Sequence, residues 1–496
     1  MDLDNVKPDL VTREFLAVVL AGFGNELLPL TSDYGDEPCP KALLPVANKP
    51  LLEYVLVWIE QSGIKDVLLI CPSAHRPSIY HHIHSDVSSS SLRIDLQTYD
   101  ESRNDNTGTC ALLRHFSSRI SEDFIVVPCD FIPPSNLPLS LLLDKFRIDA
   151  LSEACLATAC FFLSRRSEKS LHFEEWGSLP SIYPIIWEPL TGTLLHIDTS
   201  DDQDRNSDEV ELKMTLLSAY PRVKLSSSLD DSHVYVCRRS VLDILQEKPH
   251  FSSFREEFLP WLCKIQYRKS KQVKYQTDLD PPNPPTSQVL SLSHSSHFVT
   301  TRAAANSDSQ GVLSASGVLE MDHALSTIRK VGLVVYNREA EAPMRINTLH
   351  NFYEMNRRIL SGTTYTLPTD PKDRSLIDQR AQISVDSLIG ESTQIFERTT
   401  IKRSVVGRHC VIGKAVKITG SILLDHCIVE DGTKLDNCIL GKSTRVGVKA
   451  ELTRCITQAG YEVPPGEIVK GEKLEVSDWM ASPDTSIKQA QDPFIN

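Results

Sequence analysis

The residues whose types and spacing could best support chemistry lie in the first 130 positions, where glycines, a lysine and an aspartate could surround a phosphate. In the stretch AGFGNELLPLT, Gly22 and Gly24 would let backbone N–H groups turn toward an anion. Lys41 stands on a loop flanked by prolines and could neutralise a phosphate. Asp130 follows an apolar run, and its carboxylate could hold Mg²⁺. Together these residues indicate a nucleotide-phosphate loop.

One residue of this loop opposes phosphate transfer. Glu26 places a carboxylate where a loop of this shape would be expected to carry a cation. Two like unit charges at about 4 Å repel by ~4 kcal/mol at an effective dielectric of about 20. A carboxylate at this position would therefore repel the polyphosphate that such a loop would hold.

Apolar runs around these residues predict the elements that would hold them. Three short runs are apolar except for acidic residues at their ends, as strands covered on both faces are: 14–20, 66–71 and 123–130. The segment 48–63 carries one apolar stripe, which predicts a helix between the first two strands. This order implies a right-handed parallel unit, with Asp130 at the carboxyl edge of the sheet, where open α/β sheets bind ligands.

Length, charge and cysteine usage limit the class of protein. The 496 residues are enough for two or three domains, and a formal net charge of −13 argues against broad binding to nucleic acid or anionic membranes. The N-terminal residues are polar and lack the apolar core of a signal peptide, and no apolar run approaches a membrane span. The twelve cysteines form no CxxC pair, so we expect reduced thiols in a cytosolic protein.

The last quarter of the chain contains a repeat of 17 residues. Apolar positions recur in steps of six, six and five, so that Ile389, Val406, Leu423 and Leu440 form one column. This hexapeptide pattern is typical of a parallel β-helix with three short strands per coil. Each coil would bury its column residues against the next coil, about 4.8 Å away.

The cysteines of this region follow the same period. Cys410 and Cys427 are one repeat apart, as are Cys438 and Cys455. A metal site is one interpretation, but no histidine or carboxylate joins either column. We therefore expect small apolar side chains stacked in columns, with neighbouring but unbonded thiols.

Changes in composition suggest the domain organisation. We expect an α/β (Rossmann-like) domain at 10–270 and a left-handed parallel β-helix at 380–470. Between them, the Pro-, Ser- and Gly-rich segment 271–325 predicts a disordered linker. The residues 326–379 would form a connecting segment in which 345–360 is a helix, and 471–496 would form a tail.

The loop and the lysine motif together resemble the sugar nucleotidyltransferase superfamily. Its members carry approximately L-A-A-G-x-G-T-R-L-x-P-L-T and then P-K-x-L-L-P-V-x-x-K-P-L, which PKALLPVANKPL matches closely here. The resemblance implies that the α/β domain at 10–270 is nucleotidyltransferase-like (Rossmann-like). It also implies attack of a sugar phosphate on a nucleoside triphosphate, with a metal held by aspartates. A hexapeptide β-helix after the catalytic domain is also common in that superfamily.

The departures from this motif imply lost chemistry. Asn25 and Glu26 replace the family's Thr and Arg, and no second lysine for the sugar phosphate is found between 185 and 230. Asp231 is a poor match to the second metal carboxylate. We therefore expect no catalytic residue, no cofactor and no bound metal. What remains is a vestigial nucleotide-binding loop, formed by Gly22, Gly24, Glu26, Lys41 and Asp130.

Taken as a whole, the chain resembles the gamma-subunit family of the guanine-nucleotide exchange factor for translation initiation factor 2. The resemblance is carried by the loop and lysine motif, by DDSHVYVCRRSVLDIL, FSSFREEFLPWLC and RINTLHNFYEMNRRIL, and by the coils from 383 to 456. It implies pairing with the epsilon subunit, a larger complex with alpha, beta and delta subunits, and binding of initiation factor 2. The epsilon subunit would continue into a helical exchange domain, whereas this sequence ends soon after the repeat, which favours gamma.

Two alternatives are weaker. An active sugar nucleotidyltransferase, similar to mannose-1-phosphate guanylyltransferase, would explain Lys41 and Asp130 but not Glu26. A hexapeptide acyltransferase would need a catalytic histidine between coils. His409 and His426 are one repeat apart and so indicate stacked surface positions instead.

Overall fold

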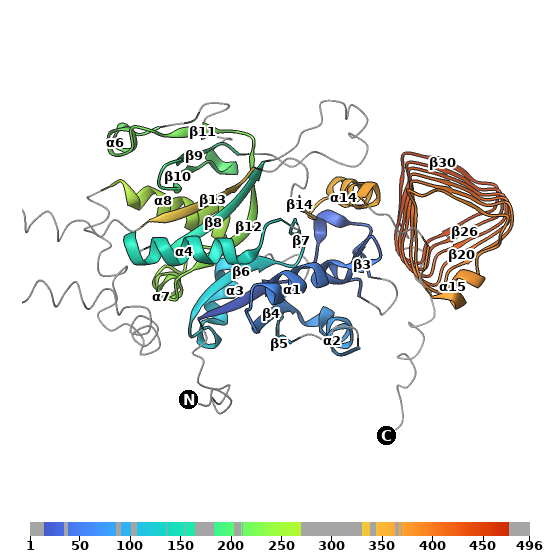
Figure 1. Cartoon of the computed structure of the whole chain (residues 1–496), viewed down its shortest axis with the longest axis horizontal. Coiled ribbons are helices and arrows are strands. Elements are labelled where there is room, and N and C mark those ends of the chain that lie inside the picture. The colour runs from blue at the N-terminus through green and yellow to red at the C-terminus, as the bar shows by residue number, and fades with distance from the viewer. Residues whose placement is uncertain are drawn as a thin grey trace, which may run out of the picture. The chain divides into compact units, whose positions relative to one another are not determined.

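The computed structural model describes residues 14–33, 38–85, 91–100, 107–134, 136–153, 155–163, 183–202, 210, 212–268, 330–337, 344–362, 367–368 and 370–475 (Figure 1). These residues divide into two compact units. The α/β unit contains the described residues up to Gly22 and from Leu51 to Arg345. The β-helix unit contains those in Phe23–Pro50 and from Ile346 onward. The predicted linker at 271–325 lies wholly outside the described residues, and so does the predicted tail beyond residue 475.

The α/β unit is built on one mixed sheet of ten strands (Figure 1). The predicted apolar runs form β1 (Phe15–Leu20), β4 (Asp66–Pro72) and β6 (Asp123–Pro128), and β1 pairs in parallel with both of the others. The antiparallel strand β12 joins β6 to the second half of the sheet. In spatial order the strands are β11 (Lys224–Ser226), β9 (Ile185–Glu188), β10 (Thr193–Ile197), β13 (Val331–Tyr336), β8 (Ala157–Leu163), β12 (Leu229–Cys237), β6 (Asp123–Pro128), β1 (Phe15–Leu20), β4 (Asp66–Pro72) and β5 (Arg93–Tyr99).

Helices cover both faces of this sheet. Side chains alternate along a strand, and Leu16, Val18 and Leu20 of β1 belong to a core formed with α3, α7 and α8. On the other face, the ring of Phe15 lies 6.0 Å from that of Phe146 in α4. Among the described residues, the α- and π-helices of this unit are α1 (Leu51–Gln61), α2 (Arg76–Ser85), α3 (Thr109–His115), α4 (Leu139–Glu153), α6 (Met214–Ala219), α7 (Ser240–Glu247), the π-helical η8 (Phe254–Phe258) and α8 (Leu259–Gln266).

The strand β13 extends the α/β unit beyond the boundary that we placed at residue 270. It lies between β8 and β10 and pairs in parallel with β8 along its whole length. Lys330, just before it, places its Nζ 3.2 Å from Oδ1 of the buried Asp149 on α4. A central strand of the sheet is therefore supplied by residues that we had assigned to a connecting segment.

The β-helix unit confirms the hexapeptide prediction. Three parallel sheets form its sides, and Val406, Leu423 and Leu440 are direct neighbours in one of them. The first sheet contains β15 (Gln382–Ile383), β18 (Thr400–Lys402), β21 (Lys417–Thr419), β24 (Lys434–Asp436), β27 (Glu451–Thr453) and β30 (Ile468–Lys470). The second contains β16 (Leu388–Ile389), β19 (Val405–Val406), β22 (Ile422–Leu423), β25 (Ile439–Leu440), β28 (Ile456–Thr457) and β31 (Lys473–Leu474). The third contains β17 (Gln394–Ile395), β20 (Val411–Ile412), β23 (Ile428–Val429), β26 (Arg445–Val446) and β29 (Glu462–Val463).

The stacked cysteines take the place of hydroxyl groups inside the coils. Thr393 donates from Oγ1 to the carbonyl of Gly407 at 2.8 Å, fourteen residues ahead. Cys410 and Cys427 repeat this bond one coil later each, to the carbonyls of Leu424 and Gly441 at 3.3 and 3.2 Å. These two cysteines, like Cys438 and Cys455, are buried thiols. The stacking that we expected is present, and all four thiols donate to backbone carbonyl groups. That the thiols stay unbonded in the isolated protein remains a prediction.

Residues from the N-terminal part of the chain belong to the β-helix unit. The hairpin of β2 (Pro45–Val46) and β3 (Lys49–Pro50) turns at Ala47 and Asn48. Nδ2 of Asn48 donates to the carbonyl of Val406 at 2.8 Å, and the N–H of Ala47 donates to Oδ1 of Asn356 at 2.8 Å. Asn356 lies on α14 (Leu349–Gly362), whose Tyr353 hydroxyl donates to the carbonyl of Gly420 at 2.9 Å. The lysine motif, helix α14 and the coils are thus joined by hydrogen bonds within this unit.

Two predicted boundaries differ from the structure. The helix expected at 48–63 begins at Leu51, because Pro45 to Pro50 form the hairpin. The helix expected at 345–360 begins at Leu349, because Arg345 belongs to β14 (Met344–Arg345), which pairs with β7 (Phe131–Ile132). A short helix, α15 (Pro371–Ser375), precedes the first coil. No helix among the described residues is long and apolar enough to cross a membrane.

Candidate functional site

Asp130 lies at the predicted sheet edge, but its carboxylate is already engaged. It follows β6 by two residues and precedes β7. Both of its oxygens accept from Nε of Arg345 at 3.2 Å. The pairing of β14 with β7 sets Arg345 opposite Phe131 and thereby beside Asp130. The side chains of Asp130 and Arg345 are 2% and 26% exposed, so this ion pair is largely shielded from water.

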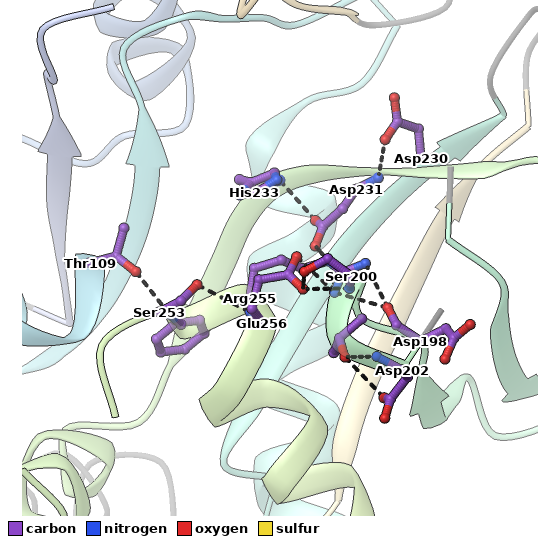
Figure 2. A network of polar contacts seen from close by, with 12 residues as sticks. Thr109, Asp198, Ser200, Asp202, Asp230, Asp231, His233, Ser253, Arg255 and Glu256 are labelled. Carbon is purple, nitrogen blue, oxygen red and sulfur yellow. Dashed lines mark hydrogen bonds and ion pairs between the residues drawn. The ribbon is translucent and has the colours of Figure 1, made fainter. Parts of the chain in front are cut away.

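A second carboxylate lies on β12, where an irregularity breaks the pairing with β8 between Asp231 and Tyr235. His233 within this bulge has a φ of 56°. Asp231 accepts from the Tyr235 hydroxyl at 2.6 Å and from the His233 N–H at 2.8 Å. Bulges often re-aim side chains next to functional sites. Here the bulge turns the Asp231 carboxylate into a buried polar network (Figure 2).

Arg255 is the cation of that network. Its Nε lies 3.1 Å from Oδ2 of Asp231, and its two terminal nitrogens donate to the carbonyl of Asp198 at 3.4 and 3.3 Å. Arg255 belongs to η8, whose first turn is capped by Ser253 accepting from the N–H of Glu256. Figure 2 shows these side chains converging from β12, η8 and the segment after β10. Asp231 is therefore paired and hydrogen-bonded.

The pKa values of the β12 carboxylates reflect this setting. Burial, aided by the neighbouring Asp231, raises the pKa of Asp230 to about 6. Burial also raises the pKa of Asp231, although the Arg255 charge and the Tyr235 hydroxyl act in the opposite direction. The positive charge of Arg345 opposes this rise in the pKa of both groups. Asp130, Asp230, Asp231 and the two arginines therefore form one electrostatic cluster.

This cluster does not fit a magnesium site. Mg²⁺ requires oxygen ligands at about 2.0–2.1 Å in near-octahedral geometry. Both oxygens of Asp130 accept from Arg345, and Asp231 is held by Arg255. Across the described part of the chain, no group of three or more His, Cys, Asp or Glu side chains could hold a metal ion. What the arrangement achieves chemically is mutual neutralisation of buried charges.

The loop residues are divided between the two units. Gly22 and Asp130 lie in the α/β unit, whereas Gly24, Glu26 and Lys41 lie in the β-helix unit. Gly24 has a φ of 80°, and a Cβ placed on it would lie 2.9 Å from Cβ of Lys41. The glycine is thus required both by its backbone conformation and by the packing of Lys41 across it. Lys41 is 8% exposed, and Glu26 is exposed on the short turn η3 (Asn25–Leu27).

Sequence reasoning missed the two arginines. Arg345 is 215 residues from Asp130, and no motif links them. Arg255 lies in FSSFREEFLPWLC, which contributed to the family resemblance without a role for any single residue. The local sequence shows only that Arg255 stands among apolar residues, and this pattern does not predict which carboxylate it pairs with.

Comparison with known proteins first defines the class. Residues 16–168 match the nucleotidyl transferase family, and residues 372–469 match the family described as the eIF2B subunit epsilon LbH domain, a left-handed β-helix. The chain is therefore a nucleotidyltransferase-like protein that continues into a left-handed β-helix, as predicted.

Full-length relatives then identify the family. The chain is 31% identical to translation initiation factor eIF2B subunit gamma of Schizosaccharomyces pombe over 475 residues, which cover 95% of this chain and 92% of that protein. It is 23% identical to the same subunit of Dictyostelium discoideum, over 81% of this chain and 89% of that protein. The epsilon subunit of D. discoideum is 23% identical over 50% of this chain and 33% of its own length. The chain belongs to the eIF2B subunit gamma family.

Proposed function

We propose that the chain pairs with an epsilon subunit in an eIF2B-type complex and promotes the exchange of GDP for GTP on translation initiation factor 2. The observation that carries this proposal is the match to a gamma subunit over 95% of the chain at 31% identity. The proposal includes alpha, beta and delta subunits in the larger complex and a cytosolic location. A net charge of −13 supports protein partners over nucleic acid or membranes.

Within this proposal the chain has no chemistry of its own. The oxygens of Asp130 are engaged by Arg345, and Asp231 is engaged by Arg255. Glu26 adds a negative charge on the exposed loop. A nucleotidyltransferase must stabilise the negative charge that develops on pyrophosphate. The vestigial loop of Gly22, Gly24, Glu26, Lys41 and Asp130 is therefore proposed as an inherited scaffold without catalytic residues.

Release of labelled GDP from initiation factor 2 tests the exchange role. We expect little release with the chain alone and faster release with chain plus epsilon subunit than with epsilon alone. The physical reason is a larger docking surface, and no catalytic group is added. Equal release by epsilon with and without the chain, at concentrations where the two co-purify, would remove the exchange proposal.

Pyrophosphate release tests the absence of transfer chemistry. The chain is incubated with a nucleoside triphosphate, a sugar 1-phosphate and Mg²⁺, and no pyrophosphate is expected. Glu26→Arg should not restore turnover, because catalytic groups act as a unit and the aspartates stay paired with arginines. Robust turnover by the unmodified chain would instead support an active sugar nucleotidyltransferase.

A further inference from the structure

We propose that the outer side of the first β-helix sheet carries a docking surface for an extended acidic segment of a partner protein. The surface is formed by the exposed side chains of Arg398, Lys402, Arg403 and Lys417, and we call it the basic face. The inference concerns the β-helix unit and does not depend on nucleotide exchange. It follows from the sequence of two coils, from strand pairing and from the ion pairs of neighbouring cations.

Two successive coils of the β-helix contain basic residues without acidic ones. No Asp or Glu occurs between Glu397 and Asp425, although the whole chain has a formal net charge of −13. The same stretch contains six basic residues, which are Arg398, Lys402, Arg403, Arg408, Lys414 and Lys417. The four that form the basic face belong to β18, to β21 and to the turns on either side of β18. Positive charge is therefore concentrated on one part of an otherwise acidic chain.

Strand pairing brings the two lysines to one surface without neutralising them. Lys417 of β21 lies between Thr400 of β18 and Lys434 of β24 in the parallel sheet. Lys434 is already paired, because its Nζ lies 2.6 Å from Oε1 of Glu451. Lys417 thus has no counter-charge at either neighbouring strand position. Lys402 follows Thr400 by two residues and points to the same side of the sheet, because side chains alternate along a strand.

The cations beside the basic face are paired, whereas those of the basic face are not. Arg380 and Lys414 both contact Glu397, at 3.2 and 3.3 Å. No ion pair joins a side chain of the basic face to another residue in the described part of the chain. Asp386 approaches Arg403 only through the backbone, whose N–H donates to Oδ1 at 3.3 Å. The basic face therefore offers charge that the β-helix itself does not use.

The chemistry of this surface favours an acidic protein segment over nucleic acid. The residues of β18 and β21 are threonine, isoleucine and lysine, so these strands supply no aromatic ring on which a base could stack. Nucleic acid would also bring a dense row of phosphates toward a chain of charge −13. A short acidic peptide meets only the local positive charge.

The spacing of the lysines suits an extended peptide. Lys402 and Lys417 are one strand and two residues apart, which corresponds to about 8 Å between their Cα atoms. Side chains on one side of an extended chain are about 6.6 Å apart. Two acidic residues at alternate positions of such a chain can therefore each meet one of these long, flexible lysines.

The test is fluorescence anisotropy of the purified full chain with labelled short peptides in which serine alternates with glutamate or, as the neutral counterpart, with glutamine. At about 0.01 M ionic strength the glutamate peptide should bind and the glutamine peptide should not. Binding should weaken at about 0.15 M, because the screening length falls from about 30 to about 8 Å. A single-stranded RNA of mixed sequence, titrated in parallel, should bind more weakly than the glutamate peptide.

Charge variants locate the binding. Lys402→Glu/Lys417→Glu should weaken binding of the glutamate peptide by more than about tenfold, because one exposed ion pair contributes about two- to fivefold and reversal adds repulsion. Lys213→Glu/Lys224→Glu makes the same change in net charge at two exposed lysines of the α/β unit, and the affinity should stay within about twofold. Lys402→Gln/Lys417→Gln should weaken binding by about fivefold and replaces the glutamate pair if that variant does not fold.

Three outcomes would overturn the inference. The first is equal binding of the glutamate and glutamine peptides by the unmodified chain at low ionic strength. The second is an affinity that both Lys402/Lys417 variants leave unchanged, or that the Lys213/Lys224 control lowers equally. The third is tighter binding of RNA than of the glutamate peptide, with the same loss in Lys402→Glu/Lys417→Glu, which would assign the surface to nucleic acid. None of these measurements involves epsilon or initiation factor 2, so they leave the proposed exchange function untouched.

Discussion

Replacing Arg255 with methionine should strongly destabilise the α/β unit. The side chains of Arg255 and Asp231 are 8% and 4% exposed, and the distance between Nε and Oδ2 is 3.1 Å. The substitution leaves Asp231 with hydrogen bonds from Tyr235 and His233 but without the arginine that contacts it. Removing one partner of a buried ion pair costs about 3–5 kcal/mol, because the remaining charge is uncompensated.

Urea unfolding followed by tryptophan fluorescence measures this loss. Trp187 and Trp261 pack against the core of the α/β unit and report on its transition. Arg147→Met is the matched control, since Arg147 lies 2.7 Å from Glu14 but both side chains are exposed, by 40% and 52%. That pair should contribute only about 0–1 kcal/mol.

The pH dependence separates charge from packing. Without Arg255, the pKa of Asp231 should rise further above its ordinary value. An aspartate whose folded pKa is raised stabilises the fold while protonated and loses that contribution as pH rises through the folded pKa. Arg255→Met should therefore regain stability on acidification from about pH 7. A loss below about 1 kcal/mol, or one that acidification does not change, would refute the reasoning.

Three other predictions test separate features, the last two each with a control substitution. Because the pKa of Asp230 is raised from 3.8 to about 6, the protein should lose stability as pH rises through this interval, and Asp230→Asn should flatten that slope in thermal unfolding. Gly407→Ala would place a Cβ 2.6 Å from the backbone of Leu424 and should cost about 1–3 kcal/mol in urea unfolding. Gly22→Ala, whose Cβ meets nothing within 4 Å, should leave stability unchanged. Cys427→Ser keeps a donor for the carbonyl of Gly441, whereas alanine at that position should cost about 1 kcal/mol in the same assay.

The β-helix could be predicted closely because its structure is nearly one-dimensional. Within the β-helix each coil pairs with the coils directly before and after it, so the period that aligns Val406 with Leu423 in the sequence also aligns them in space. The parallel strands around β1 were predictable for a related reason: their apolar runs are local and continuous. The position of Asp130 followed from the end of such a run.

The partners of the candidate site could not be predicted. Arg345 reaches Asp130 through the pairing of β14 with β7, two short strands that are far apart in the chain. A strand of two residues is too short to show an alternating apolar pattern, so the sequence does not reveal it. The same limit applies to Arg255, which meets Asp231 only because η8 packs beside the bulge of β12. The motif predicted Asp130 as a possible metal ligand. Its actual partner, Arg345, is set by the pairing of distant strands in the folded structure.

The place of β13 in the sheet has a consequence for synthesis of the protein. The strand lies between β8 and β10 in the sheet. In the chain, however, its last residue, Tyr336, comes 99 residues after Cys237, the last residue of β12. At about 5–20 residues per second, the ribosome needs roughly 5–20 s to make that stretch. During this time β8 and β10 lack their shared neighbour and keep unpaired backbone groups that can pair with other chains. The nascent chain therefore passes through a vulnerable interval that ends only when β13 has left the ribosome.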